Sequence, residues 1–178
     1  MAVRAAGPGT WVMLSYRLPR EPSTPRITVW RKLKRLGVAQ IGDGVIALPA
    51  DARTREQLEW IAEEIAEAAG SATIWLAQPT TIAAEKDLAA TMATARAAEY
   101  TDVIAAATAA ASSSAPERAV TARKLRAELR RIQRRDYFPP PQRDAARLAV
   151  HDLTTPAPEP PTPVLRAPVT DTPVMEQP

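Results

Sequence analysis

Residues 14–49, LSYRLPREPSTPRITVWRKLKRLGVAQIGDGVIALP, decide the fold, because they contain in succession a strand, a basic helix and a hairpin. The strand begins slightly earlier, at Trp11, and continues to Leu18 as a short apolar run of strand-forming residues. Pro19 ends its ability to pair with a neighbour. The sequence therefore predicts a buried strand that leads directly into the helix.

The helix is predicted between Ser23 and Gly37. Ser23 or Thr24 is the expected N-cap, Pro25 suits the first turn, and Gly37 ends the helix. The face expected to be buried consists of apolar residues at every third position: Ile27, Trp30, Leu33 and Leu36. Four cations lie outside that face: Arg31, Lys32, Lys34 and Arg35.

A β-hairpin is predicted next, because two brief apolar runs, residues 38–41 and 45–48, are joined by Gly42, Asp43 and Gly44. A second helix is expected from Thr54, which forms a capping box with Gln57, to Gly70. Residues 73–77 supply a last strand. The resulting order, βαββαβ, is that of the ferredoxin-like fold, so we predict an α+β protein with a ferredoxin-like domain at residues 11–79.

Residues 80–153 are predicted to form an antiparallel helical hairpin, because an alanine-rich helix is interrupted by three serines and then followed by another helix. Ser114 and Glu117 form a capping box at the start of the second helix, and prolines 139–141 prevent its continuation. This helix is strongly cationic, through Arg118, Arg123, Lys124, Arg126, Arg130, Arg131, Arg134 and Arg135. One more short helix is expected at residues 142–153.

Residues 154–178 are predicted to be a disordered, proline-rich tail. This segment has eight prolines, few large apolar side chains and no periodicity. Such a segment cannot recover the entropy of ordering by burial.

Composition excludes several classes of function. The chain has no cysteine, which rules out disulfides and thiolate metal sites. No apolar run approaches the roughly 20 residues of a membrane helix, so we expect a cytoplasmic protein without a membrane partner. Glycine-rich phosphate loops, metal-ligand clusters and paired nucleophile and base do not occur, and His151 has no ligand partners at motif spacing. We therefore predict no enzyme activity, no catalytic residue, no metal and no cofactor.

The strings YRLPREPSTPRITVWRKLKRLG (residues 16–37), IGDGVIALP (41–49) and RRDYFPPP (134–141) together resemble the N-terminal region of the chromate-resistance regulator family ChrB. The first half is also similar to a domain of PaaX-type transcriptional regulators, which shares the ferredoxin-like fold of the CRISPR-associated nucleases. The resemblance implies a DNA-associated transcriptional regulator of a chromate-efflux operon. Family members usually continue into a C-terminal domain where this chain has its proline-rich tail. If that domain is the part that detects chromate, we expect this chain to bind DNA or a partner without responding to the oxyanion itself.

The basic helix faces are the predicted DNA contacts, because lysine and arginine neutralise phosphates largely independently of base sequence. The candidate residues are Arg31, Lys32, Lys34, Arg35, Arg123, Lys124, Arg130, Arg131, Arg134 and Arg135. The competing interpretation is that these faces are merely solvated, with cations paired to Glu128 or to the glutamates of residues 54–70.

A candidate oxyanion site lies at the start of the first helix, where free amide groups and the helix dipole favour an anion. The residues around it are Arg17, Arg20, Ser23 and Arg26, and the expected ligands are phosphate, sulfate or chromate. The ordinary alternative is that the serine is only a cap.

Two further functions stay open. Alanine-rich helices also suit dimerisation, so a non-catalytic protein-interaction module without DNA affinity, with a homodimer as one form, is the main alternative. The third function is a phosphodiesterase of the CRISPR-associated type. Those nucleases hold a metal with an aspartate at the end of the first strand, where this sequence has Leu14, Ser15, Tyr16 and Arg17 and no carboxylate.

Several aromatic residues lie near the cations. Trp30, Tyr16 and Trp75 are candidates for stacking on bases, although aromatic residues at such spacing are more often part of a core. Tyr137 and Phe138 are better interpreted as a hydrophobic latch that docks the end of the basic helix.

Overall fold

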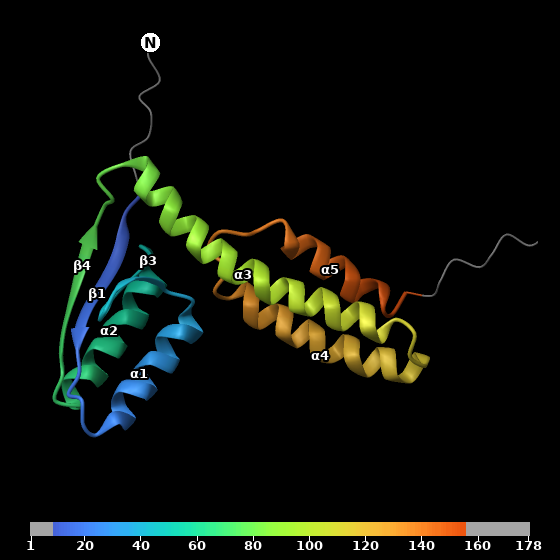
Figure 1. Cartoon of the computed structure of the whole chain (residues 1–178), viewed down its shortest axis with the longest axis horizontal. Coiled ribbons are helices and arrows are strands. Elements are labelled where there is room, and N and C mark those ends of the chain that lie inside the picture. Colours follow the sequence, from blue (N-terminus) through green and yellow to red (C-terminus); the bar gives the residue numbers. More distant parts are fainter. Residues whose placement is uncertain (1–8, 156–178) are drawn as a thin grey trace, which may run out of the picture.

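The computed structural model describes residues 9–155. Figure 1 shows the elements in chain order: β1 (Trp11–Arg17), α1 (Ser23–Leu36), β2 (Ala39–Gly42), β3 (Val45–Pro49), α2 (Ala52–Glu67), β4 (Ser71–Ala77), α3 (Ile82–Ala110), α4 (Ala115–Gln133) and α5 (Gln142–Asp152). The predicted mixture of helices with a small sheet is confirmed. The predicted disordered tail, residues 154–178, lies outside the described residues except for Thr154 and Thr155.

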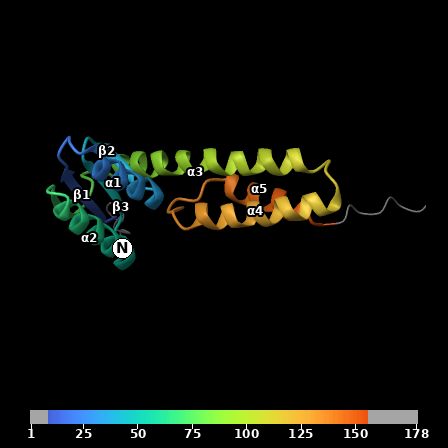
Figure 2. The ribbon, with the colours of Figure 1, turned by 90° about the horizontal axis from the view of Figure 1, so that it is seen from below.

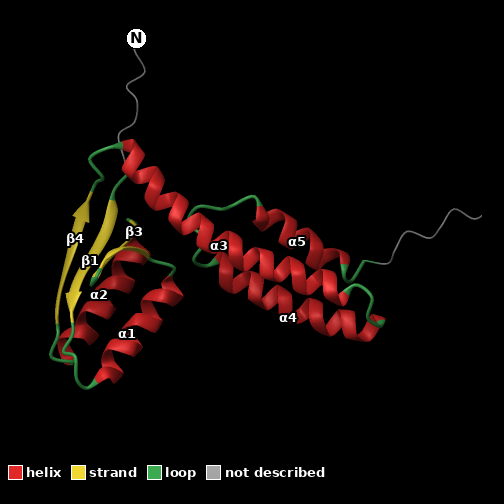
Figure 3. Cartoon of the chain, in the orientation of Figure 1, coloured by secondary structure: helices red, strands yellow, loops and turns green. Residues whose placement is uncertain are grey.

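The four strands form one antiparallel sheet in the order β2-β3-β1-β4. β1 is central: its first residue, Trp11, lies opposite Pro49 of β3 and Ala77 of β4. The turn between β2 and β3 contains Gly44 with a φ of 70°, which agrees with the predicted hairpin. Figure 3 shows α1 and α2 together on one side of the sheet, while β4 forms its free edge.

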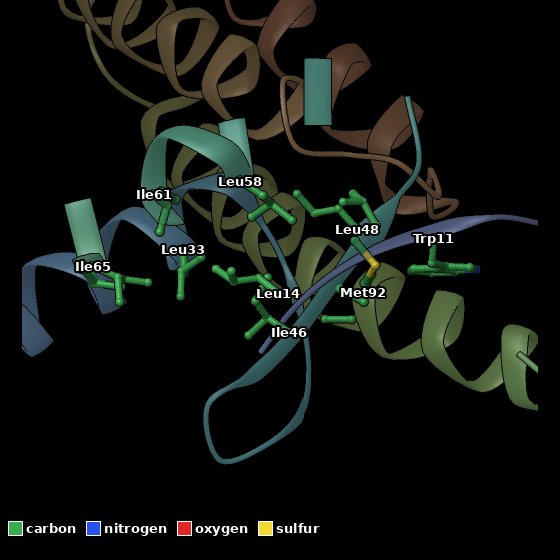
Figure 4. Packing of buried hydrophobic residues seen from close by; sticks show 13 residues of the cluster. Trp11, Leu14, Leu33, Ile46, Leu48, Leu58, Ile61, Ile65 and Met92 are labelled. Atoms are coloured by element: carbon green, nitrogen blue, oxygen red, sulfur yellow. The ribbon is translucent and has the colours of Figure 1, made fainter. Parts of the chain in front are cut away.

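The first core fills the space between the sheet and these two helices (Figure 4). Leu14, Ile46 and Leu48 point from the strands toward Leu33 of α1 and toward α2. The α2 side chains in this core are Leu58, Ile61 and Ile65. Because all of these residues are at most 5% exposed, burial of this apolar layer holds α1 and α2 on the sheet.

The start of α1 differs from the prediction. The helix begins at Ser23 and its N-cap is Pro22, without a side-chain cap hydrogen bond. The prediction of Ser23 or Thr24 as the cap is therefore wrong, because both residues already have helical positions inside the first turn. Gly37 is confirmed as the C-cap, with a left-handed φ of 74°.

The buried face of α1 also differs from the predicted stripe. Val29 and Leu33 are fully buried, whereas Ile27 is 45% exposed. An α-helix has 3.6 residues per turn, so positions at a strict spacing of three drift around the helix by about 60° per step. Four such positions cannot share one face, and Val29, four residues before Leu33, takes the inward position.

The N-cap of α2 is Asp51, one turn before the predicted Thr54. The Thr54 N–H donates to Asp51 Oδ1 at 2.7 Å, and the Asp51 N–H donates to Thr54 Oγ1 at 3.0 Å. Thr54 is fully buried and its hydroxyl also donates to the Pro49 carbonyl at 2.7 Å. The capping box predicted for Thr54 and Gln57 is thus wrong, because Thr54 is the last residue of the box rather than its first.

The end of α2 is also earlier than predicted. The helix ends at Glu67, and Ala69 rather than Gly70 has the left-handed φ, 57°. Gly70 is needed for space, since a Cβ there would lie 2.6 Å from the Arg17 carbonyl oxygen and 2.7 Å from Ile65 Cγ2. The glycine therefore lets the turn before β4 pass close to β1 instead of ending the helix.

The three C-terminal helices extend away from the sheet as an elongated unit (Figure 2). α4 runs back along α3, and α5 packs on both. The capping box of Ser114 and Glu117 is confirmed, with the Ser114 N–H donating to Glu117 Oε2 at 2.9 Å. A second core joins the helices through Tyr100, Val103, Ala107, Ala110, Ala122, Leu129, Ile132, Ala146, Val150 and Leu153.

The predicted aromatic latch is confirmed where the two units meet. The Phe138 ring stacks on Trp11 of β1, with ring centroids 5.8 Å apart. Tyr137 packs against the first core as well, and the guanidinium of Arg53 in α2 lies 5.9 Å from the centre of its ring. The segment after α4 is therefore fastened to the sheet and to α2.

Candidate nucleic-acid interface

The cations of α1 divide into one paired residue and three exposed ones. Lys32 forms an ion pair with Glu64 of α2 and is partly covered. Arg31, Lys34 and Arg35 are exposed and form no ion pair within residues 9–155. Lys34 Nζ lies 4.9 Å from the centre of the Trp30 ring. This distance places the two side chains in a cation–π contact. The α1 face therefore presents three free positive charges.

The cations of α4 are more numerous and less often paired. Arg131 forms an exposed ion pair with Glu128, at 3.0 Å between Nη1 and Oε2. Four exposed cations of this set form no ion pair within the described part of the chain: Arg123, Lys124, Arg130 and Arg134. The solvated-face interpretation therefore applies to Lys32 and Arg131, whereas the other four leave an excess of positive charge along α4.

Arg135 occupies a different environment from the other candidates, because its side chain is only 21% exposed. Its Nη2 lies 2.8 Å from Glu99 Oε2, and Arg96 Nη2 of α3 lies 2.9 Å from Glu99 Oε1. Burial, opposed by the neighbouring Glu99 carboxylate, lowers the pKa of Arg96. Arg135 therefore contributes to the packing of α3 against the end of α4.

Arg96, Glu99 and Arg135 form an internal charged cluster. Gly37 and Asp136 lie on either side of this cluster. A Cβ at Gly37 would lie 2.5 Å from Arg96 Nη1 and 2.9 Å from Arg135 Cβ, so the end of α1 rests directly on both arginines. On the other side, the Tyr100 hydroxyl donates to Asp136 Oδ2 at 2.8 Å. Burial and this hydrogen bond raise the pKa of Tyr100. The cluster thus fixes α1, α3 and the end of α4 relative to one another.

The predicted oxyanion residues surround the start of α1 without forming a defined pocket. Arg17, Arg20, Ser23 and Arg26 are all exposed. Within residues 9–155 none of these four side chains takes part in an ion pair or a hydrogen bond. The geometry of these four side chains selects no particular ligand.

A groove between α4 and α5 brings together basic side chains that the sequence predictions treated separately or left out. Its volume is about 530 Å³. Arg126 and Arg130 line it from α4, and Arg147 and His151 line it from α5. Arg126 and Arg147 were absent from the predicted contacts. The spacing of four residues between Arg143, Arg147 and His151 was the available signal in the sequence.

Trp60 is an exposed aromatic residue that the sequence argument also missed. It is 63% exposed on α2 and borders a shallow depression that Lys32 and Arg35 of α1 also line. Among the predicted stacking residues, Trp75 is 55% exposed but its Nε1 donates to Ser15 Oγ at 3.1 Å, whereas burial raises the pKa of Tyr16. Trp60 is therefore an exposed aromatic side chain that lies beside Lys32 and Arg35 of α1.

The described residues contain no group of three or more histidine, aspartate or glutamate side chains that could hold a metal ion. Asp43 is exposed in the hairpin turn. No helix within residues 9–155 combines the length and the apolar character that a membrane crossing requires.

The comparisons with known proteins give one match. A family model described as "Protein ChrB, N-terminal" matches residues 26–121, more than half of the chain. The matched segment begins in the first turn of α1, includes the sheet from β2 onward and all of α3, and ends inside α4. No curated protein and no solved structure matches the chain.

Proposed function

The chain belongs to the ChrB N-terminal family, and from this premise we propose that it is a DNA-associated transcriptional regulator that acts in chromate resistance. The family match and the three sequence strings support the link to chromate resistance. The DNA part of the proposal is supported by charge and geometry, and it does not depend on which operon is regulated.

The observation that carries the DNA proposal is the excess of exposed, unpaired cations on α4. Arg123, Lys124, Arg130 and Arg134 extend over most of this helix, and only Glu117 and Glu128 provide carboxylates on it. Release of counterions when such cations meet phosphates provides affinity that is largely independent of sequence. The α1 cations Arg31, Lys34 and Arg35 form a second candidate contact.

We also assign residues 11–79 to the ferredoxin-like fold. The succession of elements from β1 to β4, the strand order β2-β3-β1-β4 and the position of both helices on one face support this assignment. In this arrangement β1 and β3 are central, so the sheet serves as a rigid base for α1 and α2.

A protein-interaction module is the second candidate, and one observation favours it. The edge strand β4 carries Trp75 and Leu76, which are 55% and 60% exposed. An exposed edge strand with large apolar side chains is able to pair with another chain, including a second copy. Light scattering of the purified chain distinguishes a dimer from a monomer, and Trp75→Lys should then dissociate a dimer that uses this edge.

The experiment that tests the regulator proposal is a mobility-shift series. The full chain is titrated onto a duplex from the promoter region of its own operon and onto a scrambled duplex, between low and physiological salt, with and without chromate. We expect binding that weakens steeply as salt rises, and the arm with chromate shows whether the oxyanion changes it. The absence of a shift at low salt would rule out DNA binding, and metal-dependent cleavage of the duplex would favour the phosphodiesterase instead.

A further inference from the structure

We propose that the groove between α4 and α5 holds the sugar-phosphate backbone of a nucleic acid, with Arg126, Arg130 and Arg147 as its phosphate contacts. This inference rests on the proposed function and deepens it, because it names one surface among several cationic ones. The inference also gives α5 a role in phosphate binding, whereas the proposed function uses only α4 and α1.

Two antiparallel helices bring the basic side chains of the groove together. Arg126 and Arg130 are four residues apart on α4, and Arg147 and His151 are four residues apart on α5, so each pair projects from one side of its helix. Arg126 Nη2 donates to Thr154 Oγ1 at 2.7 Å, which fixes the end of α5 beside the middle of α4. The groove walls therefore have a defined spacing before any ligand binds.

A second set of hydrogen bonds also attaches the end of α5 to α4. The Arg118 guanidinium donates to the Leu153 carbonyl at 3.3 Å and to the Ser113 carbonyl at 2.9 Å. Leu129 and Val150, which also line the groove, are buried in the second core. Because its base belongs to a packed core, the groove is a fixed feature of the helical unit.

The charged side chains that line the groove carry more positive than negative charge, which favours an anion there. Among the described residues that line the groove, the one carboxylate belongs to Asp144, whose side chain is 75% exposed and lies 3.9 Å from Arg147 Nη1 and 3.4 Å from Arg143 Nε. Arg126 donates to a neutral hydroxyl, and Arg130 has no ion-pair partner within residues 9–155. Three guanidinium groups with one shared, solvated carboxylate favour a ligand of opposite charge.

The shape of the cationic surface fits a polyanion better than a single phosphate. Arg123 and Arg134 continue the line of Arg126 and Arg130 beyond both ends of the groove, at spacings of three and four residues. From Arg123 to Arg134 this line extends about 16 Å, at 1.5 Å per residue. One DNA strand carries a charge about every 3.4 Å along the helix axis, so the line faces several phosphates.

The test compares two double variants of the full chain that remove the same charge from the surface. Arg130→Gln with Arg147→Gln alters both walls of the groove. Arg55→Gln with Lys86→Gln is the matched control, because both residues are exposed, neither lines the groove and neither belongs to the proposed DNA contacts. Binding of a fluorescein-labelled 20-base-pair duplex is measured by fluorescence anisotropy across a salt series, and circular dichroism confirms that each variant is folded.

We expect the groove variant to lose about tenfold or more in affinity and its salt slope to fall by roughly 2, since each phosphate contact contributes about 0.9 to that slope. The control should lose at most about threefold through general electrostatics. The charge-conserving variant Arg130→Lys with Arg147→Lys should retain most of the affinity.

Three outcomes would overturn the inference in different ways. Equal losses in the groove and control variants would show that binding depends on overall charge and not on the groove, which leaves the regulator proposal intact. Failure of the wild-type chain to bind at low salt would remove both proposals. Displacement of the duplex by inorganic phosphate, beyond the effect of sodium chloride at equal ionic strength, would identify a site for a small free anion instead.

Discussion

Arg135 Nη2 lies 2.8 Å from Glu99 Oε2, and this ion pair ties the segment after α4 to the middle of α3. The same carboxylate also accepts from Arg96, so two arginines share one glutamate in a partly buried setting. Arg135, which the sequence predicted to lie on a basic surface, is therefore part of the packing between the helices.

This position predicts a large difference between two neighbouring arginines. Arg135→Gln should lower the free energy of unfolding by roughly 1.5–3 kcal/mol, because it removes a hydrogen bond between charged groups and leaves Glu99 with Arg96 alone. Arg134→Gln, at an exposed position, should change it by less than about 0.5 kcal/mol. Urea denaturation followed by circular dichroism measures both values, and equal stabilities would contradict the role assigned to Arg135.

The close approach of Gly37 to the arginine cluster provides a second prediction. Gly37→Ala should destabilise the fold by at least about 1–2 kcal/mol, because the left-handed φ of 74° disfavours a side chain. The new Cβ would also meet Arg96 Nη1 at 2.5 Å. Gly42→Ala is the matched control, since a Cβ there meets nothing within 4 Å. Thermal melts of the two variants should differ clearly, and a neutral Gly37→Ala would show that α1 does not rest on the cluster.

Tyr100 predicts how stability depends on alkaline pH. Its pKa is raised in the folded state by burial and by the hydrogen bond to Asp136, so folding favours the protonated phenol. The stability that this shift contributes is present below the unfolded pKa of about 10 and is lost as pH rises toward the folded pKa. Tyr100→Phe should therefore be less stable at neutral pH but lose less stability than the wild type above about pH 10.

Unfolding of both proteins in urea at a series of pH values checks this prediction. Tyr16 and Tyr137, whose pKa values burial also raises, are present in both proteins and cancel in the difference. Parallel pH dependences for wild type and variant would contradict the assigned environment of Tyr100.

Local sequence signals predicted most elements of the fold, because each has a short-range physical cause. The capping box at Ser114, the C-cap at Gly37 and the hairpin turn at Gly44 depend on residues within a few positions of each other. The cap of α2 was misplaced because Asp51 and Thr54 both suit an N-cap. The hydrogen bonds of Thr54 decide between them, since its N–H donates to Asp51 Oδ1 and its hydroxyl donates to the Pro49 carbonyl.

The candidate site was predicted less completely, because sequence shows charge but not pairing. Arg135 and Arg130 belong to the same cationic run, yet Glu99, 36 residues earlier, pairs with the first and leaves the second free. Arg147 was overlooked because α5 contributes few cations of its own. Its relation to Arg130 arises only when α5 folds back along α4.

Contact between α4 and the phosphate backbone is tested most directly by the salt dependence of duplex binding. The wild-type chain is compared with the triple variant Arg123→Gln, Arg130→Gln and Arg134→Gln. All three residues are exposed and unpaired within the described part of the chain, so the variant should fold normally. The account predicts wild-type binding at low salt and a slope of log affinity against log salt that is smaller in the variant by about 2–3. Absence of wild-type binding, or identical slopes for the two proteins, would contradict the claim that α4 contacts the phosphate backbone.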